Sequence, residues 1–350
     1  MQKYILAASL FVLPVLGACN DTNQNLTAQE AQDLQANLTG AGASFPAPLY
    51  QRWSSEYNSV EPGVQVTYQS VGSGAGVEQF TQETVDFGAS DVAMNEEEIN
   101  AVDGNVVFAP MTAGGIVLAY NLPGVDNLQL SRDVYVDILL GNITNWSDPA
   151  IAEINEGVEL PDQDITVVYR SDGSGTTGVF TKHLSDVSPE FEEQVGSGKT
   201  VEWPTGVGAK GNEGITAQIL QTEGALGYIE YGYAKTQDIT VASLENQAGN
   251  YIEPTAESMS ETLSAVELPE NLVSFITDPE GDESYPIVTY SWLLLYPEYD
   301  DENKLEALQA FLNWSLTEGQ EFSEELGYIP LPENVVERVQ DQIETLEVAQ

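Results

Sequence analysis

Basic residues are scarce in this chain. Lys and Arg together number 10, against 56 Asp and Glu, which gives a formal net charge of −46 at pH 7. A chain of this charge repels nucleic acid and anionic membrane surfaces, so neither is expected as a partner. The acidic residues are dispersed and do not form a tail. Salt screens such charges strongly, because the Debye length falls to about 3 Å at 1 M. The composition therefore indicates adaptation to a salty environment.

Cysteine and histidine each occur once, as Cys19 and His183. A single cysteine excludes a disulfide within the chain. His183 falls inside a helix predicted over residues 176–184, so a catalytic pair with the preceding serines has poor geometry. Without a His/Cys cluster, the sequence offers no zinc-type site. We expect no metal, no cofactor and no enzymatic activity, and we expect His183 to be a core or surface residue.

An apolar run near the N-terminus is too short to span a membrane. Lys3 precedes the apolar residues 5–15, and Leu-Gly-Ala-Cys ends the segment at Cys19. We interpret residues 1–18 as a signal peptide. Leu-Gly-Ala-Cys resembles a bacterial lipobox, which implies cleavage before Cys19 and a protein anchored to the membrane by lipid, in the periplasm or at the cell surface. An ordinary signal peptide with an incidental cysteine is the alternative. The polar residues 19–37 would then form a tether.

Residues 167–177 combine an arginine, an aspartate, several hydroxyl groups and glycines at the end of a strand predicted over 165–169. Ser174 is suited to cap a following helix, whose first N–H groups would remain free for an anion. Arg170 adds a two-pronged donor for phosphate or carboxylate. The segment predicts an oxyanion site. The alternative is a capped turn in which Arg170 pairs with Asp172 for structure alone.

Gly173 to Gly178 also satisfies the dinucleotide fingerprint G-x-G-x-x-G after a strand. That fingerprint requires a second strand that ends in an acidic residue about 20 residues further on. Residues 188–194 are polar and helical in character, and they contain no such strand. We therefore favour an oxyanion site over a dinucleotide site, although both would hold a negative group at a helix N-terminus.

Three other predicted strands end in loops of the same type. Ser44 follows a glycine-rich strand end, Ser73 lies before a helix predicted over 77–82, and Asp91 ends a short apolar strand. Each loop alone is a weak signal, because Gly/Ser turns are common and usually only connect elements. Their recurrence after successive strands is what points to a shared site.

Several segments together carry a family resemblance: Thr39-Gly-Ala-Gly-Ala-Ser-Phe-Pro-Ala-Pro, Val85-Asp-Phe-Gly-Ala-Ser-Asp, Arg170-Ser-Asp-Gly-Ser-Gly-Thr, and residues 115–121, 203–214 and 224–231. They closely resemble the periplasmic phosphate-binding protein of the bacterial high-affinity phosphate ABC transporter. The resemblance implies a phosphate site formed by Ser44, the Phe45 N–H group, Ser73, Asp91, Arg170, Ser174, Gly175 and Thr176. It also implies that Asp91 accepts a proton from the ligand and that Asp172 orients Arg170.

The resemblance implies an α/β fold of the periplasmic-binding-protein type II class, with two α/β lobes and the ligand in the cleft between them. Lobe I would comprise residues 38–115 and 289–350, and lobe II residues 116–288. A hinge would be crossed near 115–119 and near 287–291. Two domains also agree with chain length, since one hydrophobic core rarely supports so many residues.

The resemblance further implies inorganic phosphate as the ligand and the subunits of an ABC phosphate permease as partners. Helices are expected over 304–316 and 332–346, in the C-terminal part of lobe I. A phosphatase or other phosphoryl-transfer enzyme on the same scaffold is one alternative. A surface lipoprotein that has lost its ligand is another.

Overall fold

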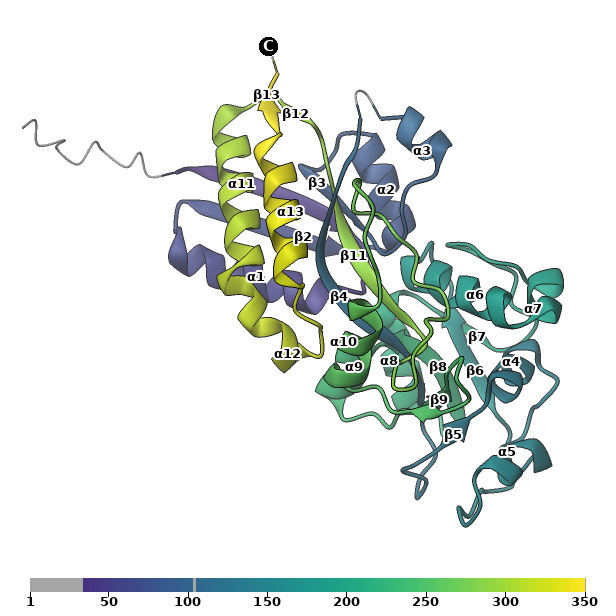
Figure 1. Cartoon of the computed structure of the whole chain (residues 1–350). Helices are drawn as coiled ribbons and strands as arrows, with labels where there is room; N and C mark the ends of the chain where they lie inside the picture. The colour runs from purple at the N-terminus through teal and green to yellow at the C-terminus, as the bar shows by residue number, and fades with distance from the viewer. Residues whose placement is uncertain (1–33, 103–104, 350) are drawn as a thin grey trace, which may run out of the picture. The chain divides into compact units, whose positions relative to one another are not determined.

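The computed structural model describes residues 34–102 and 105–349. An eight-stranded mixed sheet runs through them in the order β2-β1-β3-β11-β4-β8-β6-β7 (Figure 1). Its strands are β1 (Ala36–Gly42), β2 (Val64–Ser70), β3 (Phe87–Ser90), β4 (Val107–Tyr120), β6 (Thr166–Arg170), β7 (Val207–Ala209), β8 (Ala225–Glu230) and β11 (Val288–Leu295). The smaller sheets consist of β5 (Gln129–Leu130), β9 (Ser243–Glu245) and β10 (Tyr251–Ile252), and of β12 (Glu298–Tyr299) and β13 (Glu347–Val348). The α/β class is as predicted.

The N-terminal predictions lie mostly outside the described residues. This holds for the signal peptide (1–18), for Cys19 and for most of the tether predicted over 19–37. β1, however, begins inside the predicted tether, at Ala36. It begins there because Ala36 already pairs with Val64 in the parallel register of β1 with β2. The polar sequence of this stretch did not predict the start of a strand, because that start depends on pairing with β2.

β4 and β11 are long apolar strands in the middle of the sheet. Every residue of β11 is buried, and so is every residue of β4 after the first. Such nearly continuous apolar runs are typical of strands covered on both faces. β4 pairs antiparallel with β11 as far as Gly115 and with β8 from Ile116 onward. The change of partner falls at the first predicted hinge crossing, near 115–119. The boundaries of the two lobes remain predictions.

Helices connect the strands. The C-terminal helices α11 (Glu302–Leu316) and α13 (Glu333–Glu344) lie side by side, and α11 packs against β1 (Figure 1). They correspond to the helices predicted over 304–316 and 332–346. The remaining helices are α1 (Ala47–Val60), α2 (Ser73–Thr81), α3 (Glu96–Asn100), α4 (Arg132–Leu140), α5 (Pro149–Ile154), α6 (Gly175–Val187), α7 (Pro189–Gln194), α8 (Gly211–Gln221), α9 (Tyr231–Gln237), α10 (Ala256–Ser264), α12 (Ser323–Leu326) and the 3-10 helix η1 (Glu318–Phe322). Within the described ranges, no helix combines the length and the apolar character needed to cross a bilayer.

The predicted site loops all follow the carboxyl ends of strands. β1 is parallel to β2 and β3, and β6 is parallel to β7 and β8. Helices α1, α2 and α6 begin shortly after β1, β2 and β6, so each presents the free N–H groups of its first turn near such an end. Open α/β sheets bind ligands outside the carboxyl ends of their strands. The topology therefore gathers these loops into one region.

Candidate oxyanion-binding site

Arg170 is the last residue of β6, and its guanidinium is almost fully buried. Its Nε and Nη2 atoms donate to the two carboxylate oxygens of Asp172, at 2.8 and 2.6 Å. Asp172 also accepts from the Gly211 N–H group at 3.1 Å. Burial opposes both charges, but the hydrogen bonds and attraction within the pair raise the pKa of Arg170 and lower the pKa of Asp172. The third guanidinium nitrogen, Nη1, has no hydrogen-bond partner among the described residues.

The N-terminus of α6 lies directly after this pair. Ser174 caps the helix, because its Oγ accepts from the Thr177 N–H group at 3.0 Å. The helix begins at Gly175, one residue earlier than predicted, and ends at Val187. The N–H groups of Gly175 and Thr176 belong to the first turn and have no acceptor within the helix. Together with the helix dipole, they favour an anion at this point.

Asp91 follows β3 and is buried. Its Oδ1 accepts from the Ser291 hydroxyl at 2.8 Å, and its Oδ2 accepts from the Thr176 hydroxyl at 3.3 Å. Burial raises the pKa of Asp91 to about 7, against the opposing effects of Ser291, Arg170 and Thr176. Near neutral pH this carboxyl group is therefore divided between its protonated and ionised forms.

Ser44 and Phe45 occupy the turn between β1 and α1, and both are buried. The Ser44 Oγ accepts from the backbone N–H and from the side-chain amide of Asn212, both at 3.0 Å. The Phe45 carbonyl accepts from the Tyr328 hydroxyl at 2.7 Å, and the Phe45 ring contacts the Tyr328 ring edge-on. The Phe45 N–H group forms no hydrogen bond with another described residue.

Ser73 is the first residue of α2, so this helix begins earlier than the predicted 77–82. Gly72 precedes it with φ of +93°, a conformation that side chains rarely adopt. The Ser73 Oγ accepts from the Asp91 N–H group at 3.4 Å. The adjoining Gly74 N–H group donates to the Gly173 carbonyl at 2.8 Å, which joins this loop to the loop after β6.

Close contacts bring the four loops together. A Cβ atom at Gly175 would lie 2.8 Å from the Asp91 Cβ and would also collide with the Ser73 Oγ, so this position has no room for a side chain. Asn212 bridges Ser44 to Thr176, because its amide nitrogen donates to both hydroxyls. We use the term oxyanion cluster for the buried set of Ser44, Phe45, Ser73, Asp91, Arg170, Ser174, Gly175 and Thr176. Direct contacts join Ser73, Asp91, Gly175 and Thr176, and Asn212 connects Ser44 to Thr176.

Sequence reasoning overlooked three polar residues that contact the oxyanion cluster or adjoin it. Ser291, on β11, donates to Asp91 from 200 positions further along the chain. Asn212 and Glu230 belong to segments that carried the family resemblance, but neither was expected in the site. The Glu230 carboxyl is buried, which raises its pKa well above the usual range, and one of its oxygens has no partner among the described residues. The position of Asn212 in the motif 203–214 and of Glu230 in the motif 224–231 was the signal that could have identified them.

His183 lies within α6 and is buried, so it is a core histidine, one of the two roles expected for it. Its Nε2 shares a hydrogen bond of 2.9 Å with the Tyr135 hydroxyl. Burial lowers the pKa of His183 to about 4, which keeps the ring neutral at pH 7. It contacts no member of the oxyanion cluster through a hydrogen bond.

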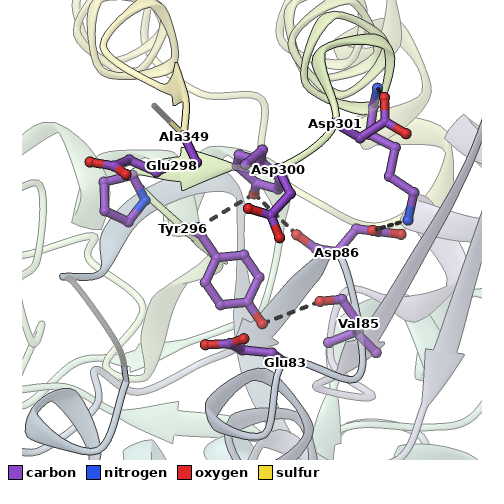
Figure 2. Close-up of a pocket in the computed structure, with 11 residues that line it drawn as sticks. Glu83, Val85, Asp86, Tyr296, Glu298, Asp300, Asp301 and Ala349 are labelled. Atoms are coloured by element: carbon purple, nitrogen blue, oxygen red, sulfur yellow. Dashed lines mark hydrogen bonds and ion pairs between the residues drawn. The ribbon is translucent and has the colours of Figure 1, made fainter.

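A cavity of about 620 Å³ lies elsewhere, between the end of α2, the loop after β11 and the start of α11 (Figure 2). Five of its eleven lining residues are acidic, among them Glu83, Asp86 and Asp300, and only Lys304 is basic. The Lys304 ammonium donates to Asp86 at 2.6 Å, and the Tyr296 hydroxyl donates to the Val85 carbonyl at 3.2 Å. The surplus of carboxylates makes this cavity unsuitable for an anion. No metal-ligating cluster of His, Cys, Asp or Glu occurs in the part of the chain that the structure describes.

The fold and the oxyanion cluster define a periplasmic-binding-protein-like domain with anion donors buried at the carboxyl ends of its strands. The PBP superfamily domain matches residues 27–318. A phosphate-binding protein PstS from Pasteurella multocida is 44% identical over 313 residues, and the match covers 88% of this chain and 90% of that protein. The protein of the same name from Haemophilus influenzae is 42% identical over 316 residues, with coverage of 89% and 94%. The chain therefore belongs to the family of PstS-type phosphate-binding proteins.

A solved structure supports the same fold. The phosphate-binding protein from Stenotrophomonas maltophilia superposes with a TM-score of 0.68 at 22% identity, covering 87% of this chain and 93% of that one. At this level of identity the likeness concerns the fold alone. The predicted family and the predicted fold class are both confirmed.

Proposed function

We propose that this protein binds inorganic phosphate outside the cytoplasmic membrane and delivers it to an ABC-type permease. The observation that carries the proposal is a surplus of buried donors. Arg170 Nη1 has no partner among the described residues, and the Gly175 N–H group at the start of α6 has no acceptor within its helix. Buried polar groups are almost always satisfied. An anion with several acceptor oxygens would satisfy these donors together.

Asp91 narrows the choice of anion to one that carries a proton. Phosphate near neutral pH retains at least one O–H group, which an ionised carboxylate accepts in a short charge-assisted hydrogen bond. Sulfate has no proton, so its oxygen would oppose the Asp91 oxygen and leave a buried group unpaired. Sites built around a specific hydrogen bond reject analogues that lack it. Phosphate therefore suits this cluster better than sulfate does.

The site roles proposed for the individual residues follow from these contacts. Ser44, Ser73 and Ser174 would donate hydroxyl hydrogens, and Phe45 and Gly175 would donate backbone N–H groups. The Thr176 hydroxyl, which donates to the Asp91 Oδ2 in this structure, would turn its hydrogen to the anion. Arg170 would bind the anion through the nitrogen that Asp172 leaves free. The contacts that now join the loops of the two predicted lobes support closure around the ligand by a hinge motion.

The membrane location is part of the proposal. The names of the relatives imply an extracytoplasmic substrate-binding protein. Lipid attachment at Cys19, followed by the polar tether, would hold the domain close to a permease. The enzyme alternative gains no support, because His183 is a neutral core residue and the relatives are named as binding proteins.

Calorimetry with phosphate, sulfate and arsenate in molar NaCl tests the proposal directly. At pH 8, where the Asp91 carboxyl is mostly ionised, we expect saturable binding of phosphate at one site and far weaker binding of sulfate. A parallel assay with a phosphomonoester should show no turnover. Absence of phosphate binding, or steady release of phosphate from the ester, would overturn the proposed function.

A further inference from the structure

Asn212 uses its backbone N–H group and both polar atoms of its side chain in the space between the oxyanion cluster and β8. It lies in the first turn of α8 and is completely buried. Its backbone N–H and its Nδ2 atom both donate to the Ser44 Oγ, and Nδ2 also donates to the Thr176 hydroxyl at 3.3 Å. Its Oδ1 accepts from the Glu230 N–H group at 2.9 Å. The last bond fixes which end of the amide faces the cluster.

This arrangement decides how the Ser44 hydroxyl can act. A hydroxyl group has one hydrogen to donate and two acceptor positions. Asn212 fills both acceptor positions of Ser44, so the hydrogen has to point to another group. Among the described residues, no acceptor receives it. The buried Ser90 hydroxyl is different, because it donates to the Val92 carbonyl at 2.6 Å.

We infer that Asn212 is a positioning residue that holds the Ser44 hydroxyl as a hydrogen-bond donor toward the bound oxyanion. This inference rests on the proposed function. A serine hydroxyl normally rotates to suit its partner and so does not discriminate donors from acceptors. With Asn212 in place, Ser44 accepts only from the protein and donates only to the ligand. The same amide reaches Thr176, so a single side chain orders hydroxyls of both predicted lobes.

A double-mutant cycle between Asn212 and Ser44 tests this inference. We expect Asn212→Ala to weaken phosphate binding at least tenfold in calorimetry, because the Ser44 hydrogen then becomes free to rotate. In the Ser44→Ala background, the same change should cost less than about threefold, since the group that it positions is already gone. Equal losses in the two backgrounds, or no loss in either, would overturn the inference.

Asn246→Ala provides a matched control. Asn246 is also buried and fully hydrogen-bonded, but its partners are backbone groups of residues 250 and 281–284. This control should lower the melting temperature and leave the dissociation constant for phosphate unchanged. If Asn246→Ala lost as much affinity as Asn212→Ala, a general loss of rigidity in the fold would explain both results, and the inference would fail.

Asn212→Asp serves if Asn212→Ala does not fold. It keeps the side-chain shape and the acceptor for the Glu230 N–H group, but it replaces the amide donor with an oxygen that attracts the Ser44 hydrogen. Its added charge weakens binding in either background and cancels in the cycle. The loss should be at least threefold greater with Ser44 than with Ser44→Ala, and equal losses would refute the inference. If the unmodified protein does not bind phosphate, the proposed function itself fails.

Discussion

The loop after β6 and the end of β3 each bring an aspartate to the oxyanion cluster, and the two carboxyl groups behave in opposite ways. Asp172 faces Arg170 through two hydrogen bonds, which keep its pKa below the usual range although burial opposes this. Asp91 receives its side-chain hydrogen bonds from the hydroxyls of Ser291 and Thr176, and burial raises its pKa to about 7. The partner, more than the residue type, sets the charge of each group.

This contrast indicates that the two regions contribute differently to anion binding. The loop after β6 offers a guanidinium edge and a helix N-terminus, which attract any oxyanion. The end of β3 offers a carboxyl group that must share one proton with its ligand. Affinity should therefore depend mainly on the first region, and selectivity mainly on the second. Substitutions in the two regions should therefore have different effects on affinity and on selectivity.

The largest effect is expected from Arg170→Ala. Removal of the guanidinium should cost on the order of 3 kcal/mol or more of phosphate binding, as when a desolvated charged pair loses one partner. The affinity for phosphate and the affinity for sulfate should both fall, because the loop after β6 does not distinguish an anion that carries a proton from one that does not. Calorimetry measures the loss, and Arg170→Lys should not restore it, since an ammonium lacks the planar fork.

Arg132→Ala is the control for Arg170→Ala. Arg132 also forms a two-pronged pair with an aspartate, Asp278, but away from the oxyanion cluster. The Arg132→Ala variant should bind phosphate with unchanged affinity. If Arg170→Ala weakened phosphate binding by less than about threefold, or if Arg132→Ala weakened it as much, Arg170 would be a structural residue.

Asp91→Asn should change selectivity more than affinity. The amide can donate to an oxygen that carries no proton, so sulfate loses its penalty while phosphate loses a charge-assisted bond. At pH 8, where Asp91 is mostly ionised, we expect the preference for phosphate over sulfate to narrow by about tenfold or more, which corresponds to about 1.4 kcal/mol. Competition between the two anions in calorimetry measures it.

Asp172→Asn is the paired experiment in the other region. Asp172 contacts Arg170, and we expect its loss to weaken both anions by similar factors, with the preference unchanged. If Asp91→Asn kept the full preference for phosphate, the rejection of sulfate would have to arise elsewhere in the cluster. If Asp172→Asn altered the preference, the division between affinity and selectivity would be wrong.

Much of the oxyanion cluster was predictable because it depends on local patterns. Gly/Ser turns after parallel strands mark the ends where loops meet, and the resemblance assigned Arg170 and Asp91 within them. The contacts that tune these residues depend on the sheet. Ser291 reaches Asp91 because β11 pairs antiparallel with β3, placing Trp292 opposite Ser90. No periodicity near either residue specifies that pairing.

Asn212 and Glu230 were missed for a similar reason. Their roles depend on a hydrogen bond between α8 and the end of β8, which appears only after the helix packs on the sheet. The early start of α2 was missed because Gly74 and Gly76 lower helix propensity. In the structure these glycines let two loops approach closely, as Gly74 lies against Gly173. At these positions the close approach of the two loops requires glycine, although glycine has a low helix propensity.

The preference between anions should also depend on pH, with a sign fixed by Asp91. Below its pKa of about 7 the carboxyl is protonated and can donate to sulfate, and above it the carboxylate opposes sulfate. The apparent affinity for sulfate scales with the protonated fraction, so it should fall by about tenfold between pH 5 and pH 8. Asp91→Asn should remove this dependence. A sulfate affinity that is constant with pH in the unmodified protein would contradict the assignment of Asp91.

The smallest expected effect separates the buried cluster from the acidic surface. Dispersed carboxylates repel one another, and salt screens exposed charges far more than buried pairs such as Arg170 with Asp172. We therefore expect the melting temperature to rise by about 1–2 °C from dilute buffer to molar NaCl, which corresponds to about 1 kcal/mol for a chain of this length. The same screening should speed phosphate association, because a net charge of −46 repels an anion at long range.

Melting curves and stopped-flow association rates across a salt series distinguish the two regions. Because the buried pair is screened little, the dissociation rate of phosphate should change much less than its association rate. A melting temperature that stayed constant or fell with salt would contradict the interpretation of the charge as adaptation to salt. It would not bear on the proposed phosphate site. A dissociation rate that rose as steeply as the association rate would instead mean that salt reaches the Arg170–Asp172 pair. In that case the oxyanion cluster would open to solvent during binding, and the contrast between its buried donors and the acidic surface would hold only for the closed protein.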